Sequence, residues 1–146
     1  MSQKNNFEVH RPFGPTVAKF SMSEKLIDTL NDYSEKIISN KKKSKDLDAG
    51  KKLAGQVTQE FDLEKEFIKT SGLLEFLGNS VATWIKHSTS LKITKFNIQS
   101  SWIVRQFKNE YNPTHWHSGH VSGVGYLKVP NTLGESYQEN KNQNSN

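Results

Sequence analysis

The chain has 146 residues, of which 33% are hydrophobic and 24% are charged, and it contains no cysteine. This length allows one domain with a modest core, and the missing cysteines exclude disulfides, iron–sulfur clusters and thiolate zinc sites. No apolar run reaches the roughly 20 residues that cross a bilayer, and the polar start lacks the apolar core of a secretory signal, so we expect a cytoplasmic protein without a membrane partner.

A net charge of +5 is compatible with nucleic-acid binding. Most basic residues are lysines, however, and the densest cluster is at residues 41–45. Specific nucleic-acid interfaces usually add arginines and stacking aromatics, whereas Arg11 and Arg105 are the only arginines and lie far apart. We therefore expect a solvated lysine-rich loop at residues 39–52 and no nucleic-acid partner. A basic binding module that uses this loop stays a third, weaker alternative.

Hydrophobic periodicity predicts the elements of the first half. A short strand over residues 7–15 ends in a Pro/Gly turn, and a helix spans about residues 23–38, where the capping-box spacing falls at residues 21–24. A short strand at residues 57–63 precedes a second helix over about residues 71–87. Its apolar stripe predicts burial against the sheet of the second half for three side chains: Leu77, Val81 and Trp84.

After the second helix the period of the pattern changes to two, which is typical of strands. Strands are predicted at residues 91–99, at residues 101–107 with Trp102 and Val104, and at residues 121–129. A turn at residues 108–113 leads into an extended piece with the histidines. Residues 131–146 are almost wholly polar and predict a disordered tail. Helices first and strands later indicate an α+β fold in which helices brace one sheet.

Three of the five histidines are close in sequence, at His115, His117 and His120. In an extended strand residues i and i+2 project from the same face, so His115 and His117 are expected to point together while Trp116 faces away into packing. Two neutral imidazoles suit Fe, Zn, Cu and Ni alike. The spacing predicts a metal site in which His115 and His117 are the ligands.

A His-x-His pair in a polar loop is more often a pair of solvent-exposed histidines. Here a proline turn precedes the pair and small residues follow it at 122–125, which favours ligands and a close approach of the backbone to a bound group. A cupin also uses His-x-His on a strand, but it expects a glutamate a few residues later, where this chain has residues 120–122, His-Val-Ser. No zincin helix motif and no Gly-x-Ser-x-Gly elbow is present.

Residues 112–130, NPTHWHSGHVSGVGYLKVP, resemble the core motif of the 2-oxoglutarate/Fe(II)-dependent oxygenases of marine bacteria and their phages. In that family an "H-x-H…SGV-x-YL-x-x-P" run marks the start of a double-stranded β-helix. Residues 101–105 and 53–61 resemble the family's preceding segments. The likeness covers most of the chain, but only residues 115–130 carry a specific motif.

The resemblance implies the N-terminal half of a jelly-roll oxygenase core, braced by N-terminal helices. It implies Fe(II) held by His115, His117 and a distal histidine, with 2-oxoglutarate as cosubstrate for the hydroxylation of an unidentified substrate. His117 matches a position where the wider superfamily more often has Asp or Glu, which leaves the site one negative charge short. His120 is expected at the surface or behind the ligands.

The distal histidine and the basic residue that pairs with 2-oxoglutarate have no counterpart after His120, where the only cations are Lys128 and Lys141. His10 and His87 are expected to be structural or at the surface. We therefore expect an incomplete or split oxygenase domain that is inactive alone, with strands supplied by a partner or by a second copy. The alternative is a non-catalytic metal-binding or interaction remnant of a jelly-roll domain.

Overall fold

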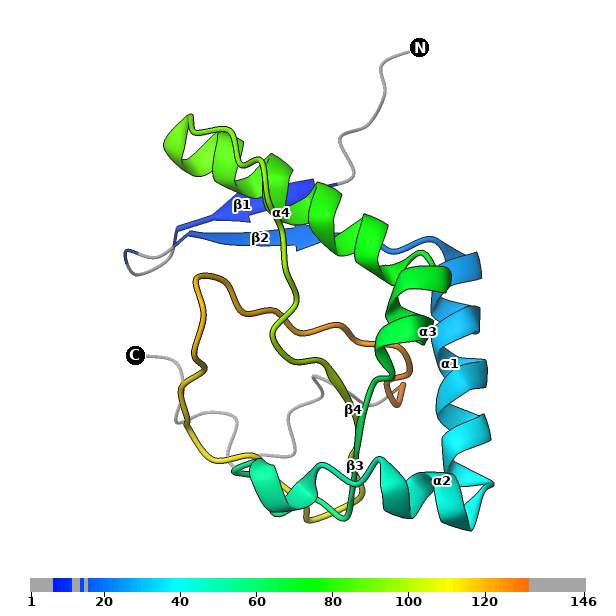
Figure 1. Cartoon of the computed structure of the whole chain (residues 1–146). Coiled ribbons are helices and arrows are strands. Elements are labelled where there is room, and N and C mark those ends of the chain that lie inside the picture. Colours follow the sequence, from blue (N-terminus) through cyan, green and yellow to red (C-terminus); the bar gives the residue numbers. More distant parts are fainter. Residues whose placement is uncertain (1–6, 12–13, 15, 132–146) are drawn as a thin grey trace, which may run out of the picture.

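The computed structural model describes residues 7–11, 14 and 16–131 (Figure 1). Within this range the chain has an α+β fold with two two-stranded antiparallel sheets and four α-helices. The predicted class is therefore confirmed, whereas the jelly-roll arrangement stays a prediction. The predicted polar tail lies outside the described residues except for Asn131.

The first sheet is a hairpin of β1 (Phe7–His10) and β2 (Val17–Phe20), in which Phe7 pairs with Phe20. Their rings stack with centroids 5.4 Å apart, and Phe7 also contacts the His87 ring at 5.0 Å. The predicted strand at the start of residues 7–15 is confirmed, and aromatic contacts hold the hairpin beside the long helix α4 (Leu73–Thr89) (Figure 1).

Helix α1 spans Glu24–Ile38, as the periodicity predicts. The predicted capping box is wrong, because the N-cap is Ser23, which has an extended backbone and whose Oγ accepts a hydrogen bond from the Leu26 amide at 3.3 Å. One face of the helix is buried at intervals of three and four residues, as expected for an amphipathic helix; it consists of Leu26, Leu30, Tyr33 and Ile37.

The lysine-rich segment is not wholly a loop. It forms helix α2 (Lys41–Asp46) and the 3-10 turn η1 (Gly50–Lys52). The Asn40 side chain caps α2 by accepting hydrogen bonds from the amides of Lys42 and Lys43. Asparagine is among the best N-cap residues because its oxygen satisfies amides that have no partner within the helix.

Strand β3 (Gln59–Asp62) lies within the predicted residues 57–63. It is followed by a short helix that the sequence did not predict, α3 (Lys65–Thr70). Gly72 separates α3 from α4 with a φ of 88°, a left-handed conformation that glycine adopts without steric cost. The predicted second helix over about residues 71–87 is therefore confirmed as α4, and α3 is an additional helix before it.

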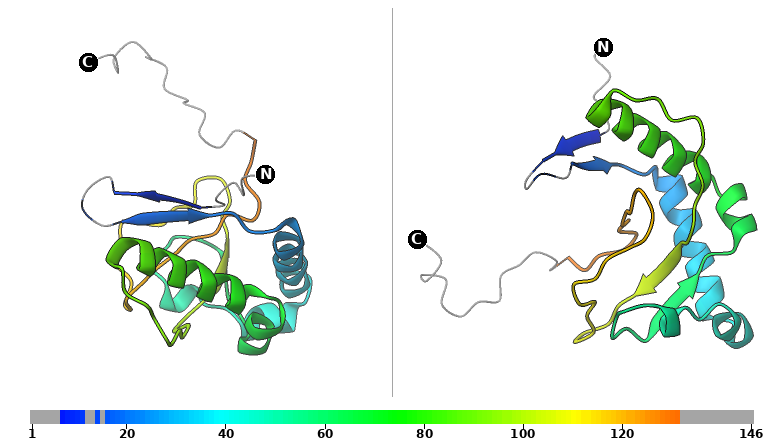
Figure 2. Two further views of the ribbon diagram at one scale, coloured as in Figure 1. Left: turned by 90° about the horizontal axis from the view of Figure 1, so that it is seen from above. Right: turned by 60° about the vertical axis from the view of Figure 1, so that its left-hand side comes forward.

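Strand β4 (Trp102–Arg105) lies within the predicted residues 101–107 and pairs with β3. The predicted strands at residues 91–99 and 121–129 are wrong, because the structure assigns no strand to either segment. An alternating pattern can specify a strand face, but a strand also needs a neighbour for its backbone hydrogen bonds. Figure 2 shows residues 106–131 running along the concave side of the arc formed by α4, α1 and the β3–β4 sheet.

The core consists of two small clusters along α1. The first contains Leu26, Leu30, Ile68 and Leu73; the second contains Tyr33, Ile37 and Phe61. Leu77 packs against the first cluster. The predicted burial of Trp84 against the sheet of Trp102 and Val104 is wrong: Trp84 is half-buried and its indole N–H donates to the Thr16 hydroxyl at 3.1 Å, beside β2.

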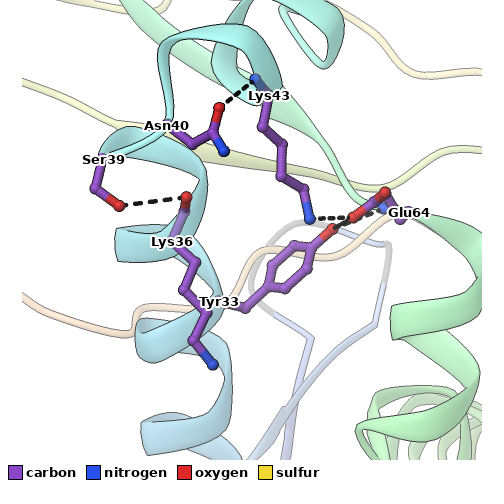
Figure 3. Close-up of polar contacts among 6 residues, drawn as sticks. All are labelled: Tyr33, Lys36, Ser39, Asn40, Lys43 and Glu64. Carbon is purple, nitrogen blue, oxygen red and sulfur yellow. Dashed lines mark hydrogen bonds and ion pairs between the residues drawn. The ribbon is translucent and has the colours of Figure 1, made fainter.

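A polar cluster joins α1, α2 and the start of α3 (Figure 3). The Tyr33 hydroxyl donates to Glu64 Oε2 at 2.6 Å, and Lys43 Nζ lies 2.6 Å from the same oxygen. Burial, with the hydrogen bond to Glu64, raises the pKa of Tyr33 to about 12. The hydrogen bonds from Lys43 and then Tyr33 lower the pKa of Glu64.

Truncation of the central core residue should destabilise the fold strongly. Ile37 is fully buried, with 0% exposure, so Ile37→Ala is expected to lower the free energy of unfolding by about 2–5 kcal/mol through lost burial and a residual cavity. Chemical denaturation measures this. Val124→Ala, at a side chain that is 80% exposed, is the control and should stay within about 0.5 kcal/mol. Equal effects of the two variants would contradict the core assignment.

Acidification should weaken the fold through Glu64. A carboxyl group whose pKa is lower in the folded than in the unfolded chain stabilises the fold above its ordinary pKa, and this contribution is lost as the pH falls through the lowered value. Glu64→Gln should therefore reduce the loss of unfolding free energy between pH 7 and pH 3, by less than about 1 kcal/mol because the carboxylate is 45% exposed. Denaturation curves at each pH test this, with exposed Glu75→Gln as the control; identical pH profiles for Glu64→Gln and wild type would contradict it.

Candidate metal centre

His115 and His117 lie in the segment that follows β4, and their rings converge. The two Nε2 atoms are 3.0 Å apart, and the ring planes are nearly perpendicular, at 81°. Two nitrogens bound at about 2.1 Å to one ion, about 90° apart, would be separated by about 3.0 Å. The spacing of the pair therefore fits adjacent positions around one metal ion, although the residues do not form a strand.

The backbone fixes the tautomer of His115. Its Nδ1 lies 2.7 Å from the Pro113 carbonyl oxygen, and because a carbonyl only accepts, Nδ1 must carry the hydrogen and donate. In a neutral imidazole the lone pair is then on Nε2, the atom that faces His117. Metal-bound histidines commonly donate their other ring N–H in this way, which fixes the ring and strengthens the ligand.

The histidine segment is anchored on the β3–β4 sheet and on the segment before β3. The His117 ring packs against Trp102 of β4 with centroids 5.6 Å apart, and the Gln56 amide donates to the Tyr111 carbonyl at 2.9 Å. A side chain at Gly55 would collide with the Asn112 side chain. The absence of a side chain at Gly55 thus leaves room for the Asn112 side chain where these two segments meet.

Glu110 holds the base of the same segment. One carboxylate oxygen accepts hydrogen bonds from the Thr58 hydroxyl at 2.6 Å and the Thr58 amide at 3.1 Å, and the other accepts from the Phe107 amide at 2.7 Å. The hydrogen bond from the Thr58 hydroxyl, followed by that from Phe107, lowers the pKa of Glu110. The turn before the histidines is therefore tied to the segment that leads into β3.

The converging histidines line a pocket of about 260 Å³. Trp116, expected to be packed inside, is instead 85% exposed at this pocket. A larger and more open pocket of about 450 Å³ lies between the starts of α1 and α4 and has no histidine in its wall. The smaller pocket is lined by Lys52, Leu53, Ala54, Glu60, Trp102, Asn112, His115, Trp116 and His117.

Glu60 is a pocket residue that the sequence did not reveal. It is 2% exposed, and its buried Oε2 atom has no hydrogen-bond partner. Burial, followed by the nearby charges of Asp48 and Glu110, raises the pKa of Glu60. The only signal in the sequence was a carboxylate within a short strand, directly before the core residue Phe61.

The other predicted residues lie away from this pair. His120 is exposed, His10 lies 3.2 Å from the Glu8 carboxylate, and His87 packs on Phe7. Among the described residues, no group of three His, Cys, Asp or Glu side chains is placed to hold one ion together. The pair would thus supply two ligands to a metal ion.

Comparison with known proteins found no matching family model, no match among curated proteins and no match among solved structures. Metal binding by His115 and His117 and the likeness to oxygenases therefore stay predictions. In the part of the chain that the structure describes, no helix is both long and apolar enough to span a membrane.

Removal of either converging imidazole should abolish metal binding. With two protein ligands the affinity of the wild-type chain for Fe(II) is expected to be micromolar or weaker, and loss of one ligand should leave no measurable binding. Anaerobic calorimetric titration with Fe(II) of wild type, His115→Ala and His117→Ala tests this. His120→Ala is the matched control and should bind as wild type does; a similar loss in all three variants would contradict the assignment of the pair.

Proposed function

We propose that this chain is the iron-binding part of a 2-oxoglutarate/Fe(II)-dependent oxygenase and that it hydroxylates a substrate only when further strands complete the domain. The converging Nε2 atoms of His115 and His117 carry the proposal, because their separation and the tautomer of His115 suit one shared ion. The motif at residues 112–130 resembles that of 2-oxoglutarate/Fe(II)-dependent oxygenases, and this resemblance is the reason for proposing oxygenase chemistry.

The donor set at the pocket fits Fe(II) in part. Two imidazole nitrogens are two of the three ligands of a facial triad, and they leave positions open for a cosubstrate. When bound there, iron supplies the redox chemistry that couples oxidative decarboxylation of 2-oxoglutarate to hydroxylation. The chain's own contribution is to fix both rings through Pro113 and Trp102 and to surround them with a shaped pocket.

The pocket also contains a cation. Lys52 is the one basic residue among its lining residues, and its ammonium now lies 3.0 Å from Asp62. A lysine ammonium can pair with a carboxylate of 2-oxoglutarate as a point charge. Lys128 is less suited to this role, because it lies 3.7 Å from Glu35 of α1.

The proposal includes a jelly-roll core that is completed by other strands, from another segment or from a second chain. Support comes from two side chains in the strand-like sequence at residues 121–130 that are uncovered: Val124 is 80% exposed and Tyr126 is 70% exposed. Pairing with further strands would cover these side chains and satisfy the backbone beside them.

A second candidate is a metal-binding or interaction domain without catalysis. One observation favours it, namely that the described residues bring together two ligands and no third. Such a domain would bind a divalent ion through the same pair but would have no preference for 2-oxoglutarate.

The effect of 2-oxoglutarate on metal binding separates the two functions. An oxygenase site should bind Fe(II) about fivefold or more tightly with 2-oxoglutarate present, because ligands that contact each other are coupled reciprocally. Anaerobic titration with 2-oxoglutarate, and with glutarate as a control that lacks the keto group, measures this. Equal affinities with both dicarboxylates would favour the non-catalytic function.

A further inference from the structure

Glu60 is a buried charged residue without a compensating partner in the described part of the chain. It is almost fully buried, and one carboxylate oxygen has no partner. No described lysine or arginine forms an ion pair with it, and the charges of Asp48 and Glu110, both acidic, disfavour its ionised form. Buried carboxylates are normally paired or bound to a cation. We therefore expect near Glu60 a positive charge that the described side chains do not supply.

The backbone directs Glu60 to the metal pocket. In β3 successive side chains point to opposite sides, and Phe61 belongs to the core cluster with Tyr33 and Ile37. Glu60 therefore points the other way, into the wall of the pocket that His115 and His117 also line. The antiparallel neighbour β4 adds Trp102, which supports the His117 ring.

The arrangement of Glu60 and the two histidines limits how Glu60 can act on a bound ion. It does not form a three-ligand group with the histidines, so direct coordination is not the arrangement shown. The pocket of about 260 Å³ has room for several waters at about 30 Å³ each. A water bound to the ion can bridge to a carboxylate across such a space.

We propose that Glu60 is the anionic group of this metal centre. Its carboxylate accepts a hydrogen bond from a water ligand of a divalent cation that His115 and His117 bind. The inference rests on the metal site of the proposed function and adds to it the source of negative charge. Two neutral imidazoles leave both positive charges of the ion unbalanced. Glu60 supplies one negative charge from β3.

The test compares Glu60→Gln, which keeps the shape and removes the charge, with wild type, His115→Ala and the control Asp32→Asn on the exposed side of α1. Calorimetry with Co(II) at constant ionic strength gives the dissociation constants of the full-length chains. We expect Glu60→Gln to bind Co(II) 10- to 100-fold more weakly, the usual effect of losing a partner behind the ligands, His115→Ala to show no binding, and Asp32→Asn to bind as wild type does.

A measurement on the wild-type chain does not depend on the folding of any variant. Addition of Co(II) should shift or broaden the side-chain carboxyl ¹³C resonance of Glu60 and leave that of Asp32 unchanged. Wild-type affinity in Glu60→Gln, or an unperturbed Glu60 resonance with Co(II) bound, overturns the role of Glu60 while the histidine site stands. Absence of Co(II) binding by the wild-type chain overturns the proposed function as well.

Discussion

The contact of Tyr33 with its neighbours is the constraint on which the rest of the fold depends. Its ring stacks on Phe67 with centroids 3.6 Å apart, and Lys43 Nζ lies 4.9 Å above the ring. Its hydroxyl donates to Glu64, the residue before α3. One side chain thus fixes α1 against α2 and α3, and Ile37, one helical turn further on, extends the same contact to Phe61 of β3.

Burial of Phe61 against α1 determines what the other face of β3 presents. A one-residue change of register would exchange the faces, placing Glu60 in the core and Phe61 at the pocket. The β3–β4 pairing fixes the register, with Glu60 opposite Val104 and Asp62 opposite Trp102. The packing of helices and the chemistry of the pocket are therefore linked through a single short strand, and the histidine segment is tied to the same sheet through Trp102.

The sequence predicted α1, β3 and β4, because each depends on local periodicity. The rings of His115 and His117 converge as predicted, but in a segment without the strand from which the prediction was made. It predicted strands at residues 91–99 and 121–129 that the structure does not contain, since local alternation carries no information on whether a partner strand is present. Glu60 was missed for a related reason. Its burial arises from tertiary packing, in which the turn η1 contacts β3, and a charged residue within a short strand is ordinarily assigned to the solvent face.

Under the proposed role of Glu60, the buried charge that disfavours the fold would favour the binding of a cation. In the metal-free chain a buried carboxylate near Asp48 and Glu110 is unfavourable, as the direction of its pKa shows. A divalent cation at the histidine pair would convert the same charge into an attraction that water screens little in a buried site. Local features that weaken a fold without evident compensation are most common at functional sites. An apolar residue at position 60 would avoid this unfavourable burial of charge, and the carboxylate is accounted for if the pocket holds a cation.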